Sequence, residues 1–521
     1  MNKLGTGTYS NVVSIKKNNK FYAMKLYKGD RREGLTFDML REIAILKKCI
    51  NSPNIISLLE IDYLKFEHIL LPIYPFTLSI YLNTKLDHKN KFVEIKTIFS
   101  KICLGLYNLH CAGIIHRDLK PSNILLKNSE EVVIIDNGLS KNISYKRDVK
   151  NKSPRIVSPL YRPPEIFLDY QNYSFEVDIW SLGIILIEML CKNPFSYYSE
   201  NDILNSQAKL VGTNHIISDF EIPRYPGEME KFSKYGEDVK SLLIKMLNFD
   251  HQKRISIADV LNSEYLKFSF CENQLLNILI PSKKNSEKID KKDNTKYIDS
   301  KIIYENYLKS WTSPYFYTNS EEIRYSITHG MRKVLLLWMI DTCTYYYFTD
   351  DVYFLACALL DRYLILSIKT VDEKNFQLLG ISCLFISSKF HTINNITLSE
   401  LMYISNENFT EEQILQMEKN VIRVCKFDLI FPLLSSFDFE FELSLKKIRK
   451  YMYICTLYQD YMKYKPYDIV KYCFLICLKF SQNENHLLKG DNKDDNNKIY
   501  KEVKKWIDNY TFEDSIEKKF R

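Results

Sequence analysis

The sequence predicts an α+β region of two lobes followed by an all-α region, and three observations support this division. Short strand-like runs such as FYAMKLY (21–27) and VVIID (132–136) occur in the first half. The segment 269–300 is polar and lacks an apolar period, which predicts a flexible linker. Beyond it strand signals almost vanish and helical spacing dominates. The expected units are a β-rich lobe over 1–73, a helical lobe over 74–268, and helical domains over 301–434 and 435–521.

The composition excludes several classes of protein. With 521 residues, 46% hydrophobic and 26% charged, the chain can bury large cores and is neither collagen-like nor wholly disordered. The net charge is +8, but basic and acidic residues are interleaved, so no direct contact with nucleic acid is expected. Twelve cysteines without a CxxC pair predict reduced thiols. No signal peptide or membrane segment is expected, so we predict an intracellular protein of the nucleus or cytoplasm.

A glycine-containing segment and a later Lys and Glu suggest a phosphate site. GTGTYS contains Gly5 and Gly7, and glycine lets a backbone approach phosphate oxygens closely. Lys25 follows in a strand-like run, and Glu42 lies in an apolar-periodic helix. A buried ion pair between them would fix the lysine against phosphates. A lone Lys or Glu is more often a solvated surface residue, so the argument depends on the whole series.

The more specific signal is HRDLKPSN (116–123), followed by a strand-like run and DNG (136–138). Phosphoryl transfer needs a carboxylate near the attacking hydroxyl, a cation on the migrating group and oxygen ligands for magnesium. These groups are supplied by Asp118, Lys120, Asn123 and Asp136. The series therefore predicts a magnesium-dependent phosphoryl transfer.

These motifs resemble those of the protein kinases over residues 1 to about 268. MLREIAIL (39–46), SPLYRPPE from Ser158, VDIWSLG from Val177 and NFDHQKRIS narrow the resemblance to cyclin-dependent kinases. The resemblance implies that Asp118 orients the substrate hydroxyl, Lys120 steadies the phosphate, and Asn123 and Asp136 hold Mg²⁺. The ATP-binding residues that it implies are Gly5, Gly7, Ala23, Lys25, Leu71 and Tyr74.

The same resemblance implies structural and regulatory positions. Glu165 should pair with Arg254, and Asp178 should brace the catalytic loop. Ser153 takes the place of an activating phosphoresidue, although it can also be an unmodified loop serine. The cations expected around its phosphate are Arg41, Arg117 and Lys141. The positions of inhibitory phosphates fall on Thr8 and Tyr9, which can alternatively only shape the loop.

The helical half resembles the cyclins. MRKVLLLW from Met331, LLDRYL, LLGISCLFISSKF and ILQMEKNVIRVCKFDL follow the order of a cyclin box over about 320–430, and a divergent second repeat follows over 435–480. The resemblance implies that Lys389 and Glu418 hold the kinase helix in its active position. Helical spacing places four residues on one face, where the resemblance implies a substrate-docking groove. An apolar stripe of this kind can equally be core. The four residues are Met331, Val334, Leu335 and Trp338.

The two resemblances together imply that a kinase and its activating subunit are joined in one chain, which predicts intramolecular pairing and activation in cis. A linker of ~30 residues has an r.m.s. span of about 30 Å and gives an effective concentration on the order of millimolar. We expect a Ser/Thr kinase that uses ATP and Mg²⁺ on protein substrates. From the family alone, through Val157 and Arg162, these carry Ser-Pro or Thr-Pro sites.

Two alternatives remain. DNG places the polar Asn137 where related kinases carry an aromatic residue beneath the ion-pairing helix. The chain can therefore be a pseudokinase fused to a cyclin, a scaffold that sequesters substrates or inhibitors. Alternatively, the cyclin module activates a separate kinase in trans.

Overall fold

The computed structural model separates the chain into two compact units, which we describe one at a time. The first comprises Met1–Lys28, Arg41–Ile143 and Lys152–Asn306, and the second comprises Gly29–Leu40, Ser144–Asn151 and Tyr307–Arg521. The structure describes residues 2–7, 10–28, 31–86, 90–142, 158–168, 173–191, 200–213, 225–267, 327–367, 371–392, 395–436, 445–458, 461, 464–479, 493–510, 516–517 and 519. The predicted linker 269–300 and the residues Thr8, Tyr9, Ser153 and Val157 lie outside them.

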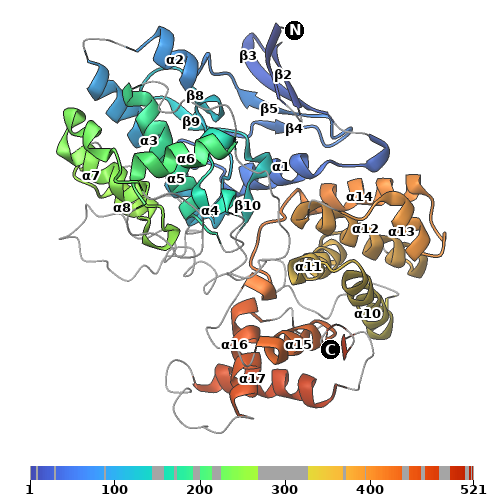
Figure 1. Ribbon diagram of the computed structural model, residues 1–521. Helices are drawn as coiled ribbons and strands as arrows, with labels where there is room; N and C mark the ends of the chain where they lie inside the picture. Colours follow the sequence, from blue (N-terminus) through green and yellow to red (C-terminus); the bar gives the residue numbers. More distant parts are fainter. Residues whose placement is uncertain are drawn as a thin grey trace. The chain divides into compact units, whose positions relative to one another are not determined.

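The first unit begins with a five-stranded antiparallel sheet in the order β1-β2-β3-β5-β4 (Figure 1). Its strands are β1 (Asn2–Thr6), β2 (Ser10–Lys17), β3 (Lys20–Tyr27), β4 (Glu60–Ile61) and β5 (His68–Pro72). Asn18 and Asn19 join β2 to β3, both at positive φ, as a two-residue hairpin turn requires. In β3, alternation places Lys25 on the same face as Ala23 and Tyr27.

The rest of the first unit is mainly helical. Helix α3 (Lys91–Cys111) and helix α5 (Glu176–Cys191) are buried along most of their length, as near-continuous apolar sequences require. The other helices are α2 (Leu78–Thr84), α4 (Pro164–Phe167), α6 (Glu200–Val211), α7 (Glu237–Met246) and α8 (Ile257–Leu261). Two small sheets flank the HRDLKPSN and DNG segments: β6 (Phe76–Thr77), β8 (Ile124–Leu126) and β9 (Val132–Ile134), then β7 (Ile114–Ile115) and β10 (Lys141–Asn142).

Helix α1 (Phe37–Lys48) carries Glu42 and links the two units along the chain. Its residues up to Leu40 cluster with the second unit, and those from Arg41 cluster with the first. Met39, Leu40 and Ile43 are almost completely buried, as the apolar period of MLREIAIL predicts. Packing of this apolar face therefore holds the helix in place.

The second unit is helical in all of its described part, which confirms the predicted α+β region followed by an all-α region. Its helices are α10 (His329–Tyr345), α11 (Asp350–Leu366), α12 (Glu373–His391), α13 (Leu398–Ile404), α14 (Glu411–Cys425), α15 (Leu445–Thr456), α16 (Pro466–Lys479) and α17 (Lys493–Asp508). Helices α11, α12 and α14 lie side by side, with α12 nearly all buried (Figure 1). The near-continuous apolar run LLGISCLFISSKF (378–390) accounts for this burial.

One stretch with the composition of a loop is helical in part. The charged run GDNKDDNNK, from Gly490, is typical of a surface loop, but α17 begins within it at Lys493. A charged composition therefore marked a helix start here and not only a loop.

The described cysteines and helices give two further results. No disulfide joins the cysteines that the structure describes, and all of them except Cys191 are buried. Among the described helices, none combines the length and the apolar character needed to cross a membrane.

Candidate active site

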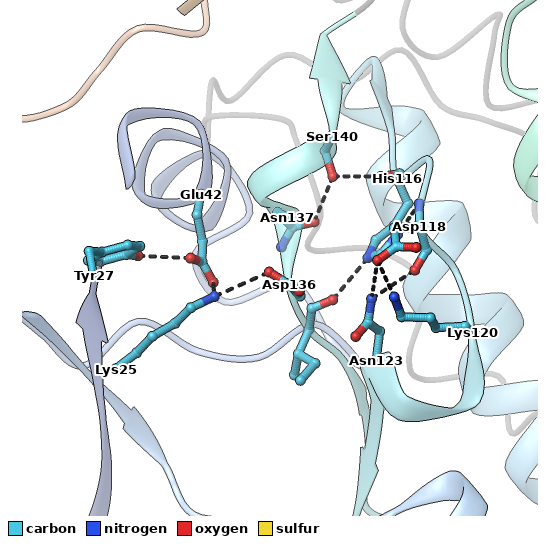
Figure 2. Close-up of polar contacts among 11 residues, drawn as sticks. Lys25, Tyr27, Glu42, His116, Asp118, Lys120, Asn123, Asp136, Asn137 and Ser140 are labelled. Carbon is cyan, nitrogen blue, oxygen red and sulfur yellow. Dashed lines mark hydrogen bonds and ion pairs between the residues drawn. The ribbon is translucent and has the colours of Figure 1, made fainter. Parts of the chain in front are cut away.

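A buried ion pair joins the sheet to helix α1. Lys25, on β3, places its Nζ 2.7 Å from Oε1 of Glu42 and 3.2 Å from Oδ1 of Asp136 (Figure 2). The second oxygen of Glu42 accepts a hydrogen bond of 2.8 Å from the hydroxyl of Tyr27. Both carboxylate oxygens of Glu42 are thus bonded, and the ammonium of Lys25 is directed toward Asp136.

Electrostatics keep this lysine charged. Burial alone would lower the pKa of Lys25, but the charges of Glu42 and Asp136 outweigh it and raise the pKa above its ordinary value. The pKa of Asp136 is lowered, because Lys25 outweighs the effect of its burial. A cation and an anion are therefore fixed side by side where phosphates and a metal ion could bind.

A second cluster surrounds Asp118. Lys120 donates from Nζ to Oδ2 of Asp118 at 2.7 Å and to the hydroxyl of Ser158 at 2.9 Å. Ser158 donates to Oδ1 of Asp118 at 3.1 Å. Because both oxygens of this buried carboxylate are bonded, Asp118 is held in one orientation.

Asn123 completes the cluster from η2 (Pro121–Asn123). Its amide Nδ2 donates to the backbone carbonyl of Asp118 at 2.8 Å and to Oδ2 of Asp118 at 3.0 Å. These bonds assign the amide nitrogen and leave Oδ1 as the acceptor end. A carboxylate from Asp136 and an amide oxygen from Asn123 are hard oxygen donors, the kind that Mg²⁺ prefers. The two side chains therefore fit a magnesium ion.

The loop that carries Asp118 is braced by Asp178 at the start of α5. Its two carboxylate oxygens accept the backbone N–H groups of His116 (2.8 Å) and Arg117 (2.9 Å), and His110 Nε2 lies 3.0 Å away. Arg117 has a φ of 64°, a left-handed conformation that costs energy in a non-glycine residue. The contacts of Asp178 thus agree with its predicted role of bracing this loop.

The predicted pair of Glu165 with Arg254 is also present. The guanidinium of Arg254 donates two hydrogen bonds, of 2.7 and 2.9 Å, to the carboxylate of Glu165.

Asn137 is completely buried in η3 (Asn137–Leu139), directly after Asp136. Its Oδ1 accepts a long hydrogen bond of 3.4 Å from Ser140. Its Nδ2 has no hydrogen-bond partner among the residues that the structure describes. A buried unpaired amide destabilises its surroundings by about 1–3 kcal/mol. The segment after Asp136 is therefore held less firmly than an apolar side chain at position 137 would hold it.

The residues predicted to contact ATP lie on the sheet and just beyond it. Ala23 on β3 is paired with Leu71 on β5, and both are buried. Gly5 lies in β1, and Gly7 follows it in a turn closed by a 2.9 Å backbone bond to Ser10. Tyr74 lies after β5, half-buried, with the Lys127 ammonium 5.1 Å from its ring centre.

The predicted phosphate-binding cations are only partly described. Arg41 is buried on α1, and Arg117 donates to the carbonyl of Leu139 at 2.8 Å and to the hydroxyl of Tyr173 at 3.3 Å. Lys141 lies in β10, but its side chain is outside the described part. Their gathering around Ser153 stays a prediction.

Within the second unit, Lys389 and Glu418 form a buried pair at 2.8 Å. Lys389 Nζ also donates to the backbone carbonyl of Glu33 at 2.6 Å, and Glu418 Oε2 accepts from the backbone N–H of Leu35 at 3.1 Å. Between them, Gly34 has a φ of +79°. A Cβ added there would lie 2.2 Å from Glu418 Oε2 and 2.6 Å from Leu415. The pair therefore binds the backbone of a segment that only glycine fits.

The four residues of the predicted docking groove differ in exposure. Val334 is exposed to 68%, and Met331 and Trp338 are partly exposed. Leu335 is buried, and its methyl groups fill the space where a side chain at Gly380 of α12 would lie. Leu335 therefore fits the second alternative, a core residue, because α12 covers its side of α10, whereas a docking role for the other three stays a prediction.

Comparisons with known proteins agree with this geometry. Residues 1–266 match the protein kinase domain, and residues 302–430 match the N-terminal domain of cyclins. The chain is 30% identical over 285 residues to a probable CTD kinase subunit alpha homolog from Encephalitozoon cuniculi, covering 51% of this chain and 82% of that protein. It is 32% identical over 289 residues to the CTD kinase subunit alpha of Saccharomyces cerevisiae, covering 51% and 54% respectively. For cyclin-dependent kinase G1 of Arabidopsis thaliana the identity is 33% over 302 residues, covering 50% and 47%.

The chain therefore belongs to the protein kinase family. It is a serine/threonine kinase similar to the cyclin-dependent kinases, and a cyclin N-terminal domain follows in the same chain. Membership of this family implies the use of ATP and a divalent metal ion.

Sequence reasoning missed three residues that the geometry brings to these sites: Tyr27, Ser158 and Gly34. Tyr27 could have been noticed because it shares a strand face with Lys25. Ser158 lies 40 residues from Asp118, so no local pattern connects them. Gly34 could have been noticed as a glycine shortly before a predicted helix, a place where the backbone often takes a conformation that favours glycine.

Proposed function

We propose that this chain transfers the γ-phosphoryl group of ATP to Ser or Thr hydroxyls of protein substrates with the help of Mg²⁺. The observation that carries the proposal is the pair of buried clusters around Lys25 and Asp118, both within the first unit. Lys25 would hold the ATP phosphates, and Lys120 would neutralise charge on the migrating group. Such positioned charges supply most of the catalysis in phosphoryl transfer.

In the proposed reaction the substrate hydroxyl oxygen forms a bond to the γ-phosphorus while the bond to the β-phosphate oxygen breaks, and ADP leaves. The hydroxyl proton passes to Asp118, whose carboxylate is oriented by Lys120 and Ser158. Mg²⁺ would be held by Asp136 and by Asn123 Oδ1, and it would neutralise phosphate charge. Among the described residues no group of three His, Cys, Asp or Glu side chains could hold a metal ion. The remaining ligands would accordingly come from phosphate and water.

We further propose activation in cis, through the segment that precedes α1. Lys389 and Glu418 bond the backbone of Glu33 and Leu35, and α1 begins two residues later at Phe37. Holding this segment would fix the start of the helix that carries Glu42. Because the linked partner is always at high effective concentration, the contact would form without a second protein.

Two finer features rest on the resemblance alone. Ser153 would be phosphorylated, and its phosphate would attract Arg41, Arg117 and Lys141. Substrates would carry Ser-Pro or Thr-Pro, and since Ser153 is itself followed by proline, autophosphorylation is part of the proposal.

The test is phosphate transfer from ATP to a Ser-Pro peptide by the full chain. Asp118→Asn should lower kcat by about 10²–10⁴-fold, because it removes the carboxylate that accepts the proton. Asp508→Asn, an exposed aspartate of α17, is the matched control and should have no effect. If Asp118→Asn were as active as the parent, Asp118 could not be the residue that accepts the hydroxyl proton.

One observation favours a second function. The buried Nδ2 of Asn137 has no hydrogen-bond partner within the described part of the chain, which would weaken the segment that carries Asp136, as expected for a kinase domain that has become a scaffold. In that case the full chain would bind protein substrates but transfer no phosphate, even with a phosphate installed at Ser153.

A further inference from the structure

We propose that Tyr27 is a positioning residue for the Lys25–Glu42 pair, and that it offsets the weak hold of the segment around Asn137. The inference rests on the proposed roles of Lys25 and Glu42. It concerns residues of the first unit only. Neither the family resemblance nor the motif spacing assigns a function to position 27.

The geometry separates the two oxygens of Glu42. Oε1 accepts from Lys25 Nζ at 2.7 Å, and Oε2 accepts from the Tyr27 hydroxyl at 2.8 Å (Figure 2). Lys25 and Tyr27 stand two residues apart on the same face of β3, so one strand grips both ends of the carboxylate. With both oxygens bonded, rotation of the carboxylate about its terminal bond would break one of the two bonds.

Glu42 needs the Tyr27 hydroxyl as a second partner because Lys25 also contacts Asp136. Asp136 also binds Lys25, at 3.2 Å, and its side chain is about half exposed. Asp136 is followed directly by Asn137, whose Nδ2 is buried without a partner among the described residues. If that segment shifts, Asp136 moves with it. Lys25 then either loses its contact with Asp136 or follows Asp136 and loses its contact with Glu42. The Tyr27 hydroxyl does not depend on residues 136–140, so it keeps Glu42 in place.

Burial makes this hydrogen bond effective. Glu42 is 2% exposed, so an oxygen of its carboxylate that lost the Tyr27 hydroxyl would have little access to water. Hydrogen bonds to buried charged groups are worth more than neutral ones, and their loss costs about tenfold or more in an equilibrium. The cost falls on the arrangement in which Glu42 faces Lys25.

The experiment compares Tyr27→Phe, which removes only the hydroxyl, with Tyr22→Phe on the opposite face of the same strand. Each is measured as the full chain for kcat and KM with ATP and a Ser-Pro peptide, and for melting temperature. We expect Tyr27→Phe to lower kcat/KM for ATP about tenfold with a near-unchanged melting temperature, and Tyr22→Phe to behave as the parent. Equal kinetics for Tyr27→Phe and the parent would overturn the inference while leaving the kinase proposal intact.

A second background tests the link to Asn137. Asn137→Leu replaces the unpaired amide by an apolar side chain of similar size, which should hold the segment more firmly. In Asn137→Leu chains the Tyr27→Phe change should then cost only about twofold, because Asp136 keeps Lys25 in place. A purely structural tyrosine would show the same loss in both backgrounds, and that result would overturn the compensating role. An inactive parent chain would instead contradict the proposed function itself.

Discussion

Two buried lysine–glutamate pairs, one in each unit, have similar distances and opposite electrostatics. Lys25 and Glu42 lie 2.7 Å apart in the first unit, and Lys389 and Glu418 lie 2.8 Å apart in the second. Lys25 has a second carboxylate nearby, Asp136, and its pKa is raised although burial opposes this. Burial lowers the pKa of Lys389, because Glu418 only partly offsets it.

The difference shows what each pair is built to do. Two carboxylates surround Lys25 and keep it protonated despite its burial. In the proposed reaction this cation binds the phosphates of ATP. Around Lys389 the negative charge offsets burial only in part, and its Nζ also donates to the Glu33 carbonyl and lies 3.6 Å from the centre of the Phe385 ring. We infer that the second pair recognises a backbone segment, while the first prepares chemistry.

The largest expected effect is on stability, from breaking the second pair. Lys389→Met leaves Glu418 as an unpaired carboxylate with no solvent exposure, which should cost about 3–5 kcal/mol of unfolding free energy. Lys389→Met with Glu418→Leu removes both charges and should restore much of that loss. Chemical denaturation of the full chain measures both, and a double variant less stable than the single one would contradict this view of the pair.

Breaking the first pair should act on the reaction instead. Lys25→Met removes the cation placed for phosphates, and we expect kcat/KM for ATP to fall about 10²–10³-fold. Lys16→Met, an exposed lysine on the neighbouring strand β2, serves as the control. Steady-state kinetics on a Ser-Pro peptide decide the matter, and a loss below threefold would argue against a phosphate-binding role for Lys25.

A smaller effect is expected from Gly34→Ala. The new Cβ meets Glu418 Oε2 at 2.2 Å, and the φ of +79° is unfavourable for alanine, so the segment should leave Lys389 and Glu418. A non-glycine residue at this φ costs about 1–3 kcal/mol, which disfavours the bound conformation of the segment. We therefore expect kinase activity to fall about tenfold. Gly212→Ala, with a φ of +88° elsewhere in the chain, controls for backbone strain. If both substitutions lower activity equally, contact with Glu418 is not the cause.

The smallest expected effect is on the pH dependence of stability at alkaline pH, which should have opposite signs for Lys25 and Lys389. The pKa of Lys25 is raised on folding, so its stabilising contribution is full below about 10.5, the ordinary lysine value, and is lost as the pH rises toward the folded pKa. The pKa of Lys389 is lowered, so folding is opposed by the cost of keeping this lysine protonated in its buried site, and that cost falls as the pH rises toward 10.5. Unfolding free energies of Lys25→Met and Lys389→Met, each compared with the parent across this range, should therefore diverge in opposite directions. Parallel curves would contradict the assigned shifts.

Much of the candidate site was predictable because its residues lie in short motifs. Asp118, Lys120 and Asn123 fall within eight consecutive residues, and the loop closes on itself, so sequence distance approximates spatial distance. The helix of Glu42 followed from its apolar period. The Tyr27 hydroxyl bond did not, because it depends on how closely α1 approaches β3.

Faces of helices were predicted better than the partners that cover them. The spacing of Val334 and Leu335 placed both on one side of α10, but burial of Leu335 depends on Gly380 of α12, which provides the space. The unpaired amide of Asn137 likewise appears only when its neighbours are in place. Such features belong to packing between elements, which a local pattern does not encode.

The most direct test of activation in cis mixes two inactive full-length chains. Asp118→Asn has an intact cyclin pair but no catalytic carboxylate, whereas the Lys389→Met, Glu418→Leu double variant has the carboxylate but no pair. Each is checked for folding by its melting temperature and assayed alone and in equimolar mixture on a Ser-Pro peptide, beside the active parent. Activation in cis predicts that the mixture is no more active than its components. Recovery of a large fraction of parental activity in the mixture would show activation between chains and contradict the account.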